Sequence, residues 1–416
     1  MNKMNYVIML HNPILINYYE EATYMENFNT FPDRKDTRSV KWDKVEELYG
    51  SEDVQPLWVA DMDLEIASPI KKALHERVDH GIFGYTFTDD ALNQVVIHWV
   101  KSHHNFDVQS DEIVYSPGVL ETIHMAILTQ TDELDKILIQ TPVYHPFHHM
   151  IKRHNRTLVT SPLINTAGHY TMDFNDLEEQ FKTGVKMMIL CSPHNPIGRV
   201  WTKEELKRVL ELAAKYNVLI VSDEIHADLI YPGHTHTPIA SLDSATNNQI
   251  ITLMSPTKTF NLAGLQISYA VIPDKKMRTQ IKNAFVRFGI TMLNPLGIVA
   301  LEAAYTKGED WLNQLIELLT TNKALVETTL ESYDHVTVTK AEGTYLLWLD
   351  FNGLNMNHDE LKTWMEQDAK LGLNSGITFG ENGSGFMRMN IASPTAYVKE
   401  ALNKLTKALD EQAKSK

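Results

Sequence analysis

Cysteine is nearly absent from this 416-residue chain: Cys191 stands alone, so no disulfide can form within the chain. A lone thiol is typical of a reducing compartment, and a cytoplasmic protein is therefore expected. Long apolar runs are also missing, because no uninterrupted run reaches the length of about 18 residues that crosses a bilayer. In residues 1–24 the apolar pieces are interrupted, and no small-residue cleavage site follows them. We expect neither a membrane span nor a signal peptide.

Positive charge is scarce as well. The chain has 38 lysines and arginines against 53 aspartates and glutamates, a formal net charge of −15. This balance argues against nucleic acid or an anionic membrane as the main partner. There is no low-complexity tract and no internal repeat, and a content of 43% hydrophobic and 22% charged residues is that of an ordinary globular protein. A small-molecule partner is therefore expected.

The apolar pattern predicts an α/β fold in two domains, since the chain is longer than one hydrophobic core usually serves. Short apolar segments alternate with helical patterns, which predicts a mostly parallel seven-stranded sheet with helices on both faces. The predicted strands are Ile113–Tyr115, Lys136–Gln140, Thr157–Thr160, Lys186–Cys191, Val218–Ser222, Ile250–Met254 and Ile267–Ile272. After residue 295, long helical segments and strands at Gly343–Phe351 and Phe386–Ile391 predict a smaller α+β domain. We expect an N-terminal extension (1–24), a segment joining the small domain (25–74), a large domain (75–295) and a small domain (296–416).

Local signals give three further expectations. Ser68-Pro69 looks like a helix cap followed by proline, so a helix is predicted from there to about His80, and Thr202 is predicted to cap a helix to Tyr216. The stretch from residue 37 to residue 63 is loop-like. The scattered histidines match no metal-ligand spacing and are expected on the surface or in loops. These histidines are His103, His104, His148, His149, His234 and His236.

Lys258 follows the predicted strand Ile250–Met254, at the point where ligands collect in open α/β sheets. Burial among small hydroxyl and apolar residues would lower its pKa, and an uncharged amine can attack a carbonyl. The alternative is a loop lysine that points into water.

Two other predicted strands also end in polar residues. Asp223 would be costly at a buried strand end unless it meets a cation, such as a protonated ring nitrogen. Its neighbours in Asp223-Glu224-Ile225-His226 leave open a metal site or a solvated helix start, but the i, i+4 histidine pair of a zinc helix is missing. Asn195 lies in a turn with two prolines and a glycine, where it could donate to a ligand oxygen or serve the turn alone.

Gly118 and Arg388 complete the candidates. Gly118 stands between a predicted strand and a predicted helix, where free backbone N–H groups can hold a phosphate, although a plain helix start is the alternative. Arg388 shares one strand face with Phe386 and Asn390, so its guanidinium could bind a carboxylate at two points. An exposed strand arginine is the alternative.

Together these residues are the parts needed to hold pyridoxal phosphate and an amino acid. Their order resembles the aspartate aminotransferase superfamily, fold type I of the pyridoxal-phosphate enzymes, from about Met25 onward. Within this superfamily, several sequence motifs are closer to those of one branch, the MalY/PatB carbon–sulfur lyases. The segments that carry this resemblance are Ser39-Val40-Lys41-Trp42-Asp43, Trp58-Val59-Ala60-Asp61-Met62-Asp63, Ser192-Pro193-His194-Asn195-Pro196-Ile197-Gly198-Arg199-Val200-Trp201 and Ser222-Asp223-Glu224-Ile225-His226-Ala227-Asp228-Leu229.

The resemblance implies a role for each residue. Lys258, Asp223 and Tyr144 would be catalytic: the lysine carries the cofactor, the aspartate pairs with the ring nitrogen, and the tyrosine stacks on the ring. Asn195 would meet the ring oxygen and the substrate, with His226 beside it, and Arg388 would bind the substrate α-carboxylate. The phosphate would be held by Gly118, Val119, Leu120, Ser255, Thr257 and, from the neighbouring subunit, Tyr85. One departure is Gln266, which stands about where aminotransferases place a phosphate-binding arginine.

The activity that the resemblance implies is β-elimination on cystathionine or another cysteine S-conjugate, giving a thiol, pyruvate and ammonia. The resemblance also implies a homodimer with shared active sites, a place in methionine biosynthesis and no metal. An aminotransferase is the first alternative, since it uses the same residues. A regulatory protein that binds a transcription regulator is the second.

Overall fold

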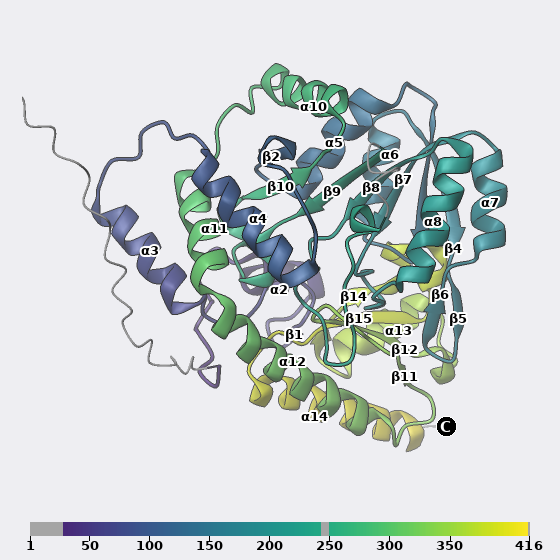
Figure 1. Cartoon of the computed structure of the whole chain (residues 1–416). Coiled ribbons are helices and arrows are strands. Elements are labelled where there is room, and N and C mark those ends of the chain that lie inside the picture. Colours follow the sequence, from purple (N-terminus) through teal and green to yellow (C-terminus); the bar gives the residue numbers. More distant parts are fainter. Residues whose placement is uncertain (1–27, 243–248, 415–416) are drawn as a thin grey trace, which may run out of the picture.

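The computed structural model describes residues 28–242 and 249–414 (Figure 1). The predicted extension at residues 1–24 lies outside the described residues. Figure 1 shows a large sheet with helices on both sides in the upper part of the molecule, and a smaller sheet with α12 (Glu309–Leu330) and α14 (Thr395–Lys414) below it. Within the described ranges, each helix is too short or too polar to cross a bilayer.

The large sheet has seven strands in the order β2-β10-β9-β8-β7-β3-β4. Strand β10 is antiparallel to both of its neighbours, and the pairs from β9 to β4 are parallel. Each of the seven predicted strand segments contributes one strand, so the predicted mostly parallel seven-stranded sheet is confirmed. The strands are β2 (Ile113–Ser116), β3 (Lys136–Thr141), β4 (Thr157–Pro162), β7 (Val185–Cys191), β8 (Leu219–Asp223), β9 (Ile250–Met254) and β10 (Ser268–Val271).

Two apolar cores cover the two faces of this sheet. On β9, Ile250 and Met254 belong to one core and Ile251 and Leu253 to the other, as expected from side chains that alternate along a strand. One core includes residues of α4 (Asp90–His104), α7 (Phe174–Lys182), α8 (Lys203–Tyr216) and α11 (Pro295–Lys307), and the other includes residues of α5 (Val119–Gln130), α6 (Pro146–Arg153) and α10 (Lys275–Arg287). The sheet is therefore buried on both faces, which explains its continuous apolar strands.

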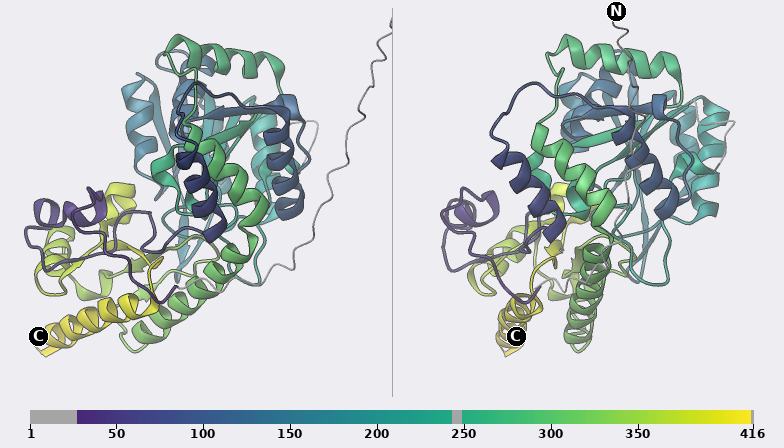
Figure 2. Two further views of the ribbon diagram at one scale, coloured as in Figure 1. Left: turned by 90° about the vertical axis from the view of Figure 1, so that its left-hand side faces the viewer. Right: turned by 60° about the vertical axis from the view of Figure 1, so that its left-hand side comes forward.

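The smaller sheet has the order β11-β12-β15-β14, with every pair antiparallel. A separate parallel pair joins β1 (Gln55–Pro56) to β13 (Leu371–Gly372), so the N-terminal part of the described chain lies against this unit (Figure 2). Both views in Figure 2 show α12 and α14 adjacent at its base. The remaining elements are β5 (Ile164–Thr166), β6 (His169–Thr171), β11 (Thr337–Val338), β12 (Leu346–Asp350), β14 (Asn374–Ser375), β15 (Phe386–Asn390) and α13 (His358–Gln367).

Three local predictions need correction or refinement. The stretch from 37 to 63 contains α1 (Val40–Asp43), α2 (Val45–Tyr49) and β1, which are too short to give a periodic signal. Helix α3 runs over Ser68–Asp79, and Ser68 is its first residue, because Ala67 occupies the cap. Strand β12 begins at Leu346 and not at residue 343. The cap at Thr202 is confirmed, since its hydroxyl accepts from the N–H of Glu205 at 3.1 Å.

Candidate active site

Three candidate residues lie at or just beyond the carboxyl ends of three adjacent parallel strands. Cys191 at the end of β7 lies opposite Asp223 at the end of β8, and Asp223 lies opposite Leu253 near the end of β9. Asn195 and Lys258 come a few residues after β7 and β9, so they reach the same edge of the sheet as Asp223. This is the edge at which open α/β sheets bind ligands.

Lys258 lies on the one-turn helix α9 (Pro256–Thr259), which Ser255 caps by accepting from the N–H of Thr257 at 3.0 Å. Its side chain does not extend into solvent, because Nζ donates to the carbonyl of Ala60 at 2.7 Å. The pKa of Lys258 is lowered to about 8, mainly by burial and also by the positive charge of Arg388, while Asp61 and Asp223 act against both. About a tenth of the amine is therefore uncharged at pH 7, far more than for an ordinary lysine.

Asp223 is buried, with 4% of its surface exposed. Among the described residues, its carboxylate accepts one hydrogen bond, from the N–H of Ile225 at 3.2 Å. Burial raises the pKa of Asp223 to about 7, and the neighbouring charge of Glu224 contributes. A buried carboxyl with a single backbone partner needs a cationic or N–H donor to become fully ionised. A protonated pyridine nitrogen is such a donor, so this residue fits the ring of pyridoxal phosphate.

His226 lies beside Asp223 and is buried, with its ring edge-on to Tyr345 at 5.8 Å. Burial lowers the pKa of His226 to about 3, helped by Lys258 and Arg388, so the ring is neutral. Its Nδ1 atom is buried and has no hydrogen-bond partner in the part of the chain that the structure describes. An orphaned polar atom at this point can serve a bound ligand.

Gly118 is the N-cap of α5, and the first N–H groups of the helix, those of Val119 and Leu120, have no acceptor within the helix. The carboxylate of Glu121 lies over Gly118: a Cβ at position 118 would be 2.2 Å from Oε2, so a larger residue there would require the Glu121 side chain to move. From the other side, the hydroxyls of Ser255 and Thr257 meet at 2.7 Å. N–H groups and hydroxyls of this kind can bind a phosphate without any cationic side chain.

Arg388 comes from the smaller sheet and points toward the turn after β7. Its Nη1 donates to Asn195 Oδ1 at 3.1 Å, its Nη2 donates to Asn374 and to the carbonyl of Trp58, and its guanidinium lies 5.0 Å from the ring centre of Phe379. Burial lowers the pKa of Arg388 to about 10, which still leaves the guanidinium charged at neutral pH. Its Nε is buried without a partner among the described residues. A buried cation with only neutral partners is suited to an incoming carboxylate.

Tyr144 lies after β3 and is half-buried. Burial raises the pKa of Tyr144, the charge of Arg388 acts against this effect, and the charge of Asp223 adds to it. It therefore belongs to the same cluster. Two residues do not. Tyr85 is 92% exposed, and Gln266 is exposed with a left-handed backbone (φ 53°). The structure thus brings the predicted residues together, with the exception of Tyr85, which was predicted to act on a neighbouring subunit.

The expectation that all the scattered histidines lie on the surface or in loops was wrong for His104, which is buried in α4, whereas His236 lies in a loop but is buried as well. Both are buried because each has a carboxylate partner: His104 Nε2 is 2.8 Å from Asp228, and His236 Nε2 is 2.8 Å from Glu224. Asp228 also accepts from Thr259, the residue next to Lys258. No group of three or more His, Cys, Asp or Glu side chains in residues 28–242 and 249–414 is arranged to bind a metal.

Comparisons with known proteins agree with this geometry. The model of the family "Aminotransferase class I and II" matches residues 56–405. Cystathionine beta-lyase PatB of Bacillus subtilis is 40% identical over 92% of this chain and 100% of its own length. Among solved structures, cystalysin from Treponema denticola, which contains pyridoxal 5'-phosphate, is 34% identical with a TM-score of 0.90, over 93% of this chain and 100% of its own. A PLP-bound protein from Clostridium difficile 630, provisionally named an aminotransferase, is 43% identical with a TM-score of 0.90 over 92% and 100%.

Proposed function

The chain belongs to the class I and II aminotransferase family, and from this premise we propose that it is a pyridoxal-phosphate-dependent carbon–sulfur lyase. Its substrates are cystathionine or other cysteine S-conjugates, which it converts by β-elimination to a thiol, pyruvate and ammonia. The observation that carries the proposal is the convergence of Lys258, Asp223 and Arg388 beside Asn195 at one sheet edge. The relatives named cystathionine beta-lyase and cystalysin support the lyase reaction over others of the family.

The residues present fit pyridoxal phosphate. Asp223 would accept the N–H of the ring, Tyr144 would lie against the ring, and Asn195 and His226 would face its polar edge. The phosphate would be bound by the N–H groups of Val119 and Leu120 at Gly118, by the hydroxyls of Ser255 and Thr257, and by Tyr85 of a neighbouring subunit. When bound, the cofactor supplies an aldehyde that links to amines and a ring that takes up the electron pair left at the substrate Cα.

The reactive atom of Lys258 is its amine nitrogen, Nζ. Because its pKa is lowered to about 8, the amine is partly uncharged at neutral pH and can both hold the cofactor and accept a proton. The uncharged Nζ is also the group that would take the proton from the substrate Cα. The charge on Asp223 would hold a proton on the ring nitrogen of the bound cofactor.

Arg388 and Asn195 orient the substrate. The guanidinium binds the α-carboxylate, which fixes the Cα–H bond relative to Nζ. The thiolate then leaves from Cβ without a strong acid, because thiols ionise near pH 8.5 and the anion is tolerable in neutral solution. One water is consumed overall as pyruvate and ammonia are released.

We also place the protein in the cytoplasm as a homodimer. The single cysteine fits a reducing compartment. An apolar run between α3 and α4 is exposed in the single chain, at 64% for Ile82, 56% for Phe83 and 81% for Phe87, and Tyr85 lies within it. A second copy that covers this run would bring Tyr85 to the neighbouring phosphate site. Light scattering of the purified protein tests the dimer, and a monomer would contradict it.

An aminotransferase is the second candidate, because the provisionally named Clostridium difficile relative supports it. Wild-type protein, Lys258→Ala and, as a control, Lys276→Ala on the exposed side of α10 are incubated with L-cystathionine, with and without an added keto acid. The lyase releases pyruvate without keto acid in wild type and in the control, and none in Lys258→Ala. Formation of a new amino acid from the keto acid without pyruvate would favour the aminotransferase, and pyruvate from Lys258→Ala would refute the role of the lysine.

A further inference from the structure

The segment Trp58–Asp63, here called the strap, contacts Lys258 and Arg388 and is held by its backbone carbonyls. Every carbonyl from Trp58 to Met62 accepts a hydrogen bond from a side chain. The donors are Arg388 to Trp58 (2.8 Å), Asn390 to Val59 and Asp61 (both 2.6 Å), Lys258 and Tyr345 to Ala60 (2.7 and 2.9 Å), and Arg34 and Asn261 to Met62 (3.2 and 3.0 Å). The strap therefore joins the proposed carboxylate-binding arginine to the proposed cofactor lysine.

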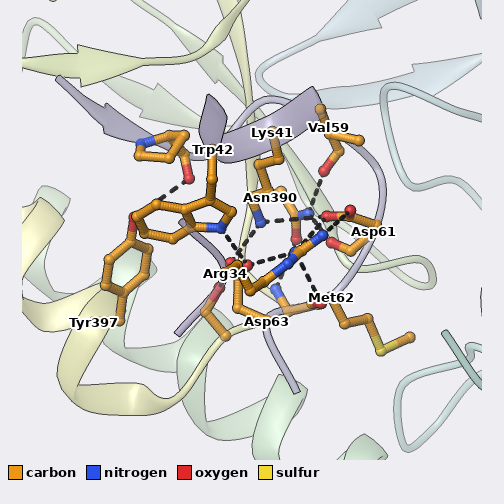
Figure 3. A network of polar contacts seen from close by, with 12 residues as sticks. Arg34, Lys41, Trp42, Val59, Asp61, Met62, Asp63, Asn390 and Tyr397 are labelled. Atoms are coloured by element: carbon orange, nitrogen blue, oxygen red, sulfur yellow. Dashed lines mark hydrogen bonds and ion pairs between the residues drawn. The ribbon is translucent and has the colours of Figure 1, made fainter. Parts of the chain in front are cut away.

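The far end of the strap is fixed by a cluster of four charges, here called the anchor (Figure 3). Arg34 pairs with Asp61 at 2.6 Å and with Asp63 at 2.7 Å. Lys41 pairs with Asp63 at 2.6 Å and lies 3.7 Å from Asp61. The anchor thus contains two cations and two carboxylates, and both carboxylates belong to the strap.

The anchor is largely buried, so its ion pairs are weakly screened by solvent and can fix the position of the strap. Lys41 and the side chain of Asp63 are fully buried, and Arg34 is 22% exposed. Burial alone would raise the pKa of Asp63, but Lys41, Trp42 and Arg34 together hold it below the ordinary value. Buried ion pairs with several hydrogen bonds leave few alternative arrangements, so loss of one cation would shift the strap.

We propose that the anchor is a positioning device for the amine of Lys258, acting through the carbonyl of Ala60. This inference rests on the proposed function, in which Nζ takes the proton from the substrate Cα. A carbonyl that accepts from Nζ fixes its position and stabilises the ammonium formed by that proton. Because Ala60 is the residue before Asp61, a shift of the anchor moves the carbonyl directly, and a misplacement of about 1 Å can cost roughly a hundredfold in rate. Arg34 is thus a positioning residue that touches neither cofactor nor substrate.

The test uses Arg34→Gln, the milder Arg34→Lys and a control, Arg278→Gln. Arg278 is also a buried arginine in an ion pair, with Asp111, and it lies on α10 away from the strap. The holoenzyme is incubated with L-alanine in D2O, and exchange of the Cα proton is followed by NMR. Alanine has no leaving group, so this signal reports proton transfer by Lys258 and not elimination. Arg34→Gln is expected to lower the exchange kcat at least about tenfold with little change in KM. Arg34→Lys is expected to be intermediate, because it keeps the charge and loses the two-point pairing.

A second readout uses cofactor-free protein. In Arg34→Gln, amide hydrogen exchange should accelerate at Met62 and Asp63, whose N–H groups donate to Asn261 and Ala392. Arg278→Gln should change neither the alanine exchange nor the amide exchange. If Arg34→Gln does not fold, both measurements are made on Arg34→Lys. Unchanged alanine exchange per loaded site, whether or not the strap amides accelerate, would overturn the inference. If wild type exchanges alanine but releases no pyruvate from any sulfur amino acid, the proposed lyase function fails and the inference stands.

Discussion

Arg388 Nη1 donates to Asn195 Oδ1 at 3.1 Å, and this bond joins strand β15 of the small sheet to the turn after β7 of the large one. The two residues stand 193 positions apart in the chain. The proposed carboxylate site therefore lies between the two sheets, with the proposed cofactor residues on the side of the large sheet.

Substitution of Arg388 by lysine should weaken substrate binding more than it slows the reaction. Lysine keeps the charge but cannot bind a carboxylate at two points. Loss of a charge-assisted hydrogen bond costs about 2 kcal/mol, which corresponds to roughly a thirtyfold rise in KM for cystathionine. Steady-state kinetics measures this, with Arg208→Lys on the exposed face of α8 as the control. A KM equal to that of the control would contradict the role of Arg388.

Substitution of Asp223 by asparagine should act mainly on kcat. The amide has nearly the same shape but carries no charge to hold a protonated ring nitrogen. Removal of one preorganised electrostatic partner costs on the order of a hundredfold in kcat. The control is Asp173→Asn, which alters an aspartate at the cap of α7. Retention of wild-type kcat by Asp223→Asn would show that no cationic group meets this carboxylate.

Substitution of Glu121 by glutamine should tighten binding of the cofactor. The Glu121 carboxylate lies over Gly118 at the N-terminus of α5, where it would repel the phosphate. A charge near a helix end is worth about 0.3–1 kcal/mol, so the Kd should fall by roughly two- to fivefold. Titration of cofactor-free protein measures the effect, and pyridoxal, which has no phosphate, is the control ligand. An equal gain for pyridoxal would show that Glu121 does not act on the phosphate.

Acid should destabilise the fold in part through His194. Burial lowers the pKa of His194 from 6.5 to about 4 in the folded protein. Between these values the unfolded chain binds a proton that the folded protein does not, so the free energy of unfolding falls as the pH falls from 6.5 toward 4. The full effect is about 3 kcal/mol, from roughly 1.4 kcal/mol per pH unit.

Urea unfolding of cofactor-free protein at several pH values between 4.5 and 7.5 measures this effect. Wild type should lose more stability on acidification than His194→Gln, because the variant lacks the group that titrates. His98→Gln, which changes an exposed histidine on α4, should behave as wild type. Parallel pH profiles for wild type and His194→Gln would contradict the assignment.

The large sheet could be predicted from the sequence because its strands are buried on both faces and read as short apolar runs. Lys258, Asp223 and Asn195 could be placed together for the same reason, since each follows the carboxyl end of such a strand. No sequence pattern near Arg388 or Asn195 predicts that the two residues are in contact. This contact depends on how β15 faces the large sheet, which is set by packing between segments far apart in the chain.

Two features of the site were missed for different physical reasons. His104 is buried because of Asp228, which lies 124 positions away, and a spacing rule for metal ligands cannot detect a single carboxylate partner. The residues of the strap contributed to the family resemblance, but their contacts with the active site could not be predicted. These contacts with Lys258 and Arg388 use backbone carbonyls. Every residue has a carbonyl, so no residue type at Ala60 could have indicated this contact.

The attachment of the cofactor to Lys258 is the central claim, and one measurement tests it directly. Protein loaded with pyridoxal phosphate is reduced with borohydride, digested and analysed by mass spectrometry. We predict that the pyridoxyl mass is found on the peptide that contains Lys258, at close to one label per chain, and that Lys258→Ala carries none. A label on another lysine in place of Lys258, or no label on protein that has bound the cofactor, would contradict it.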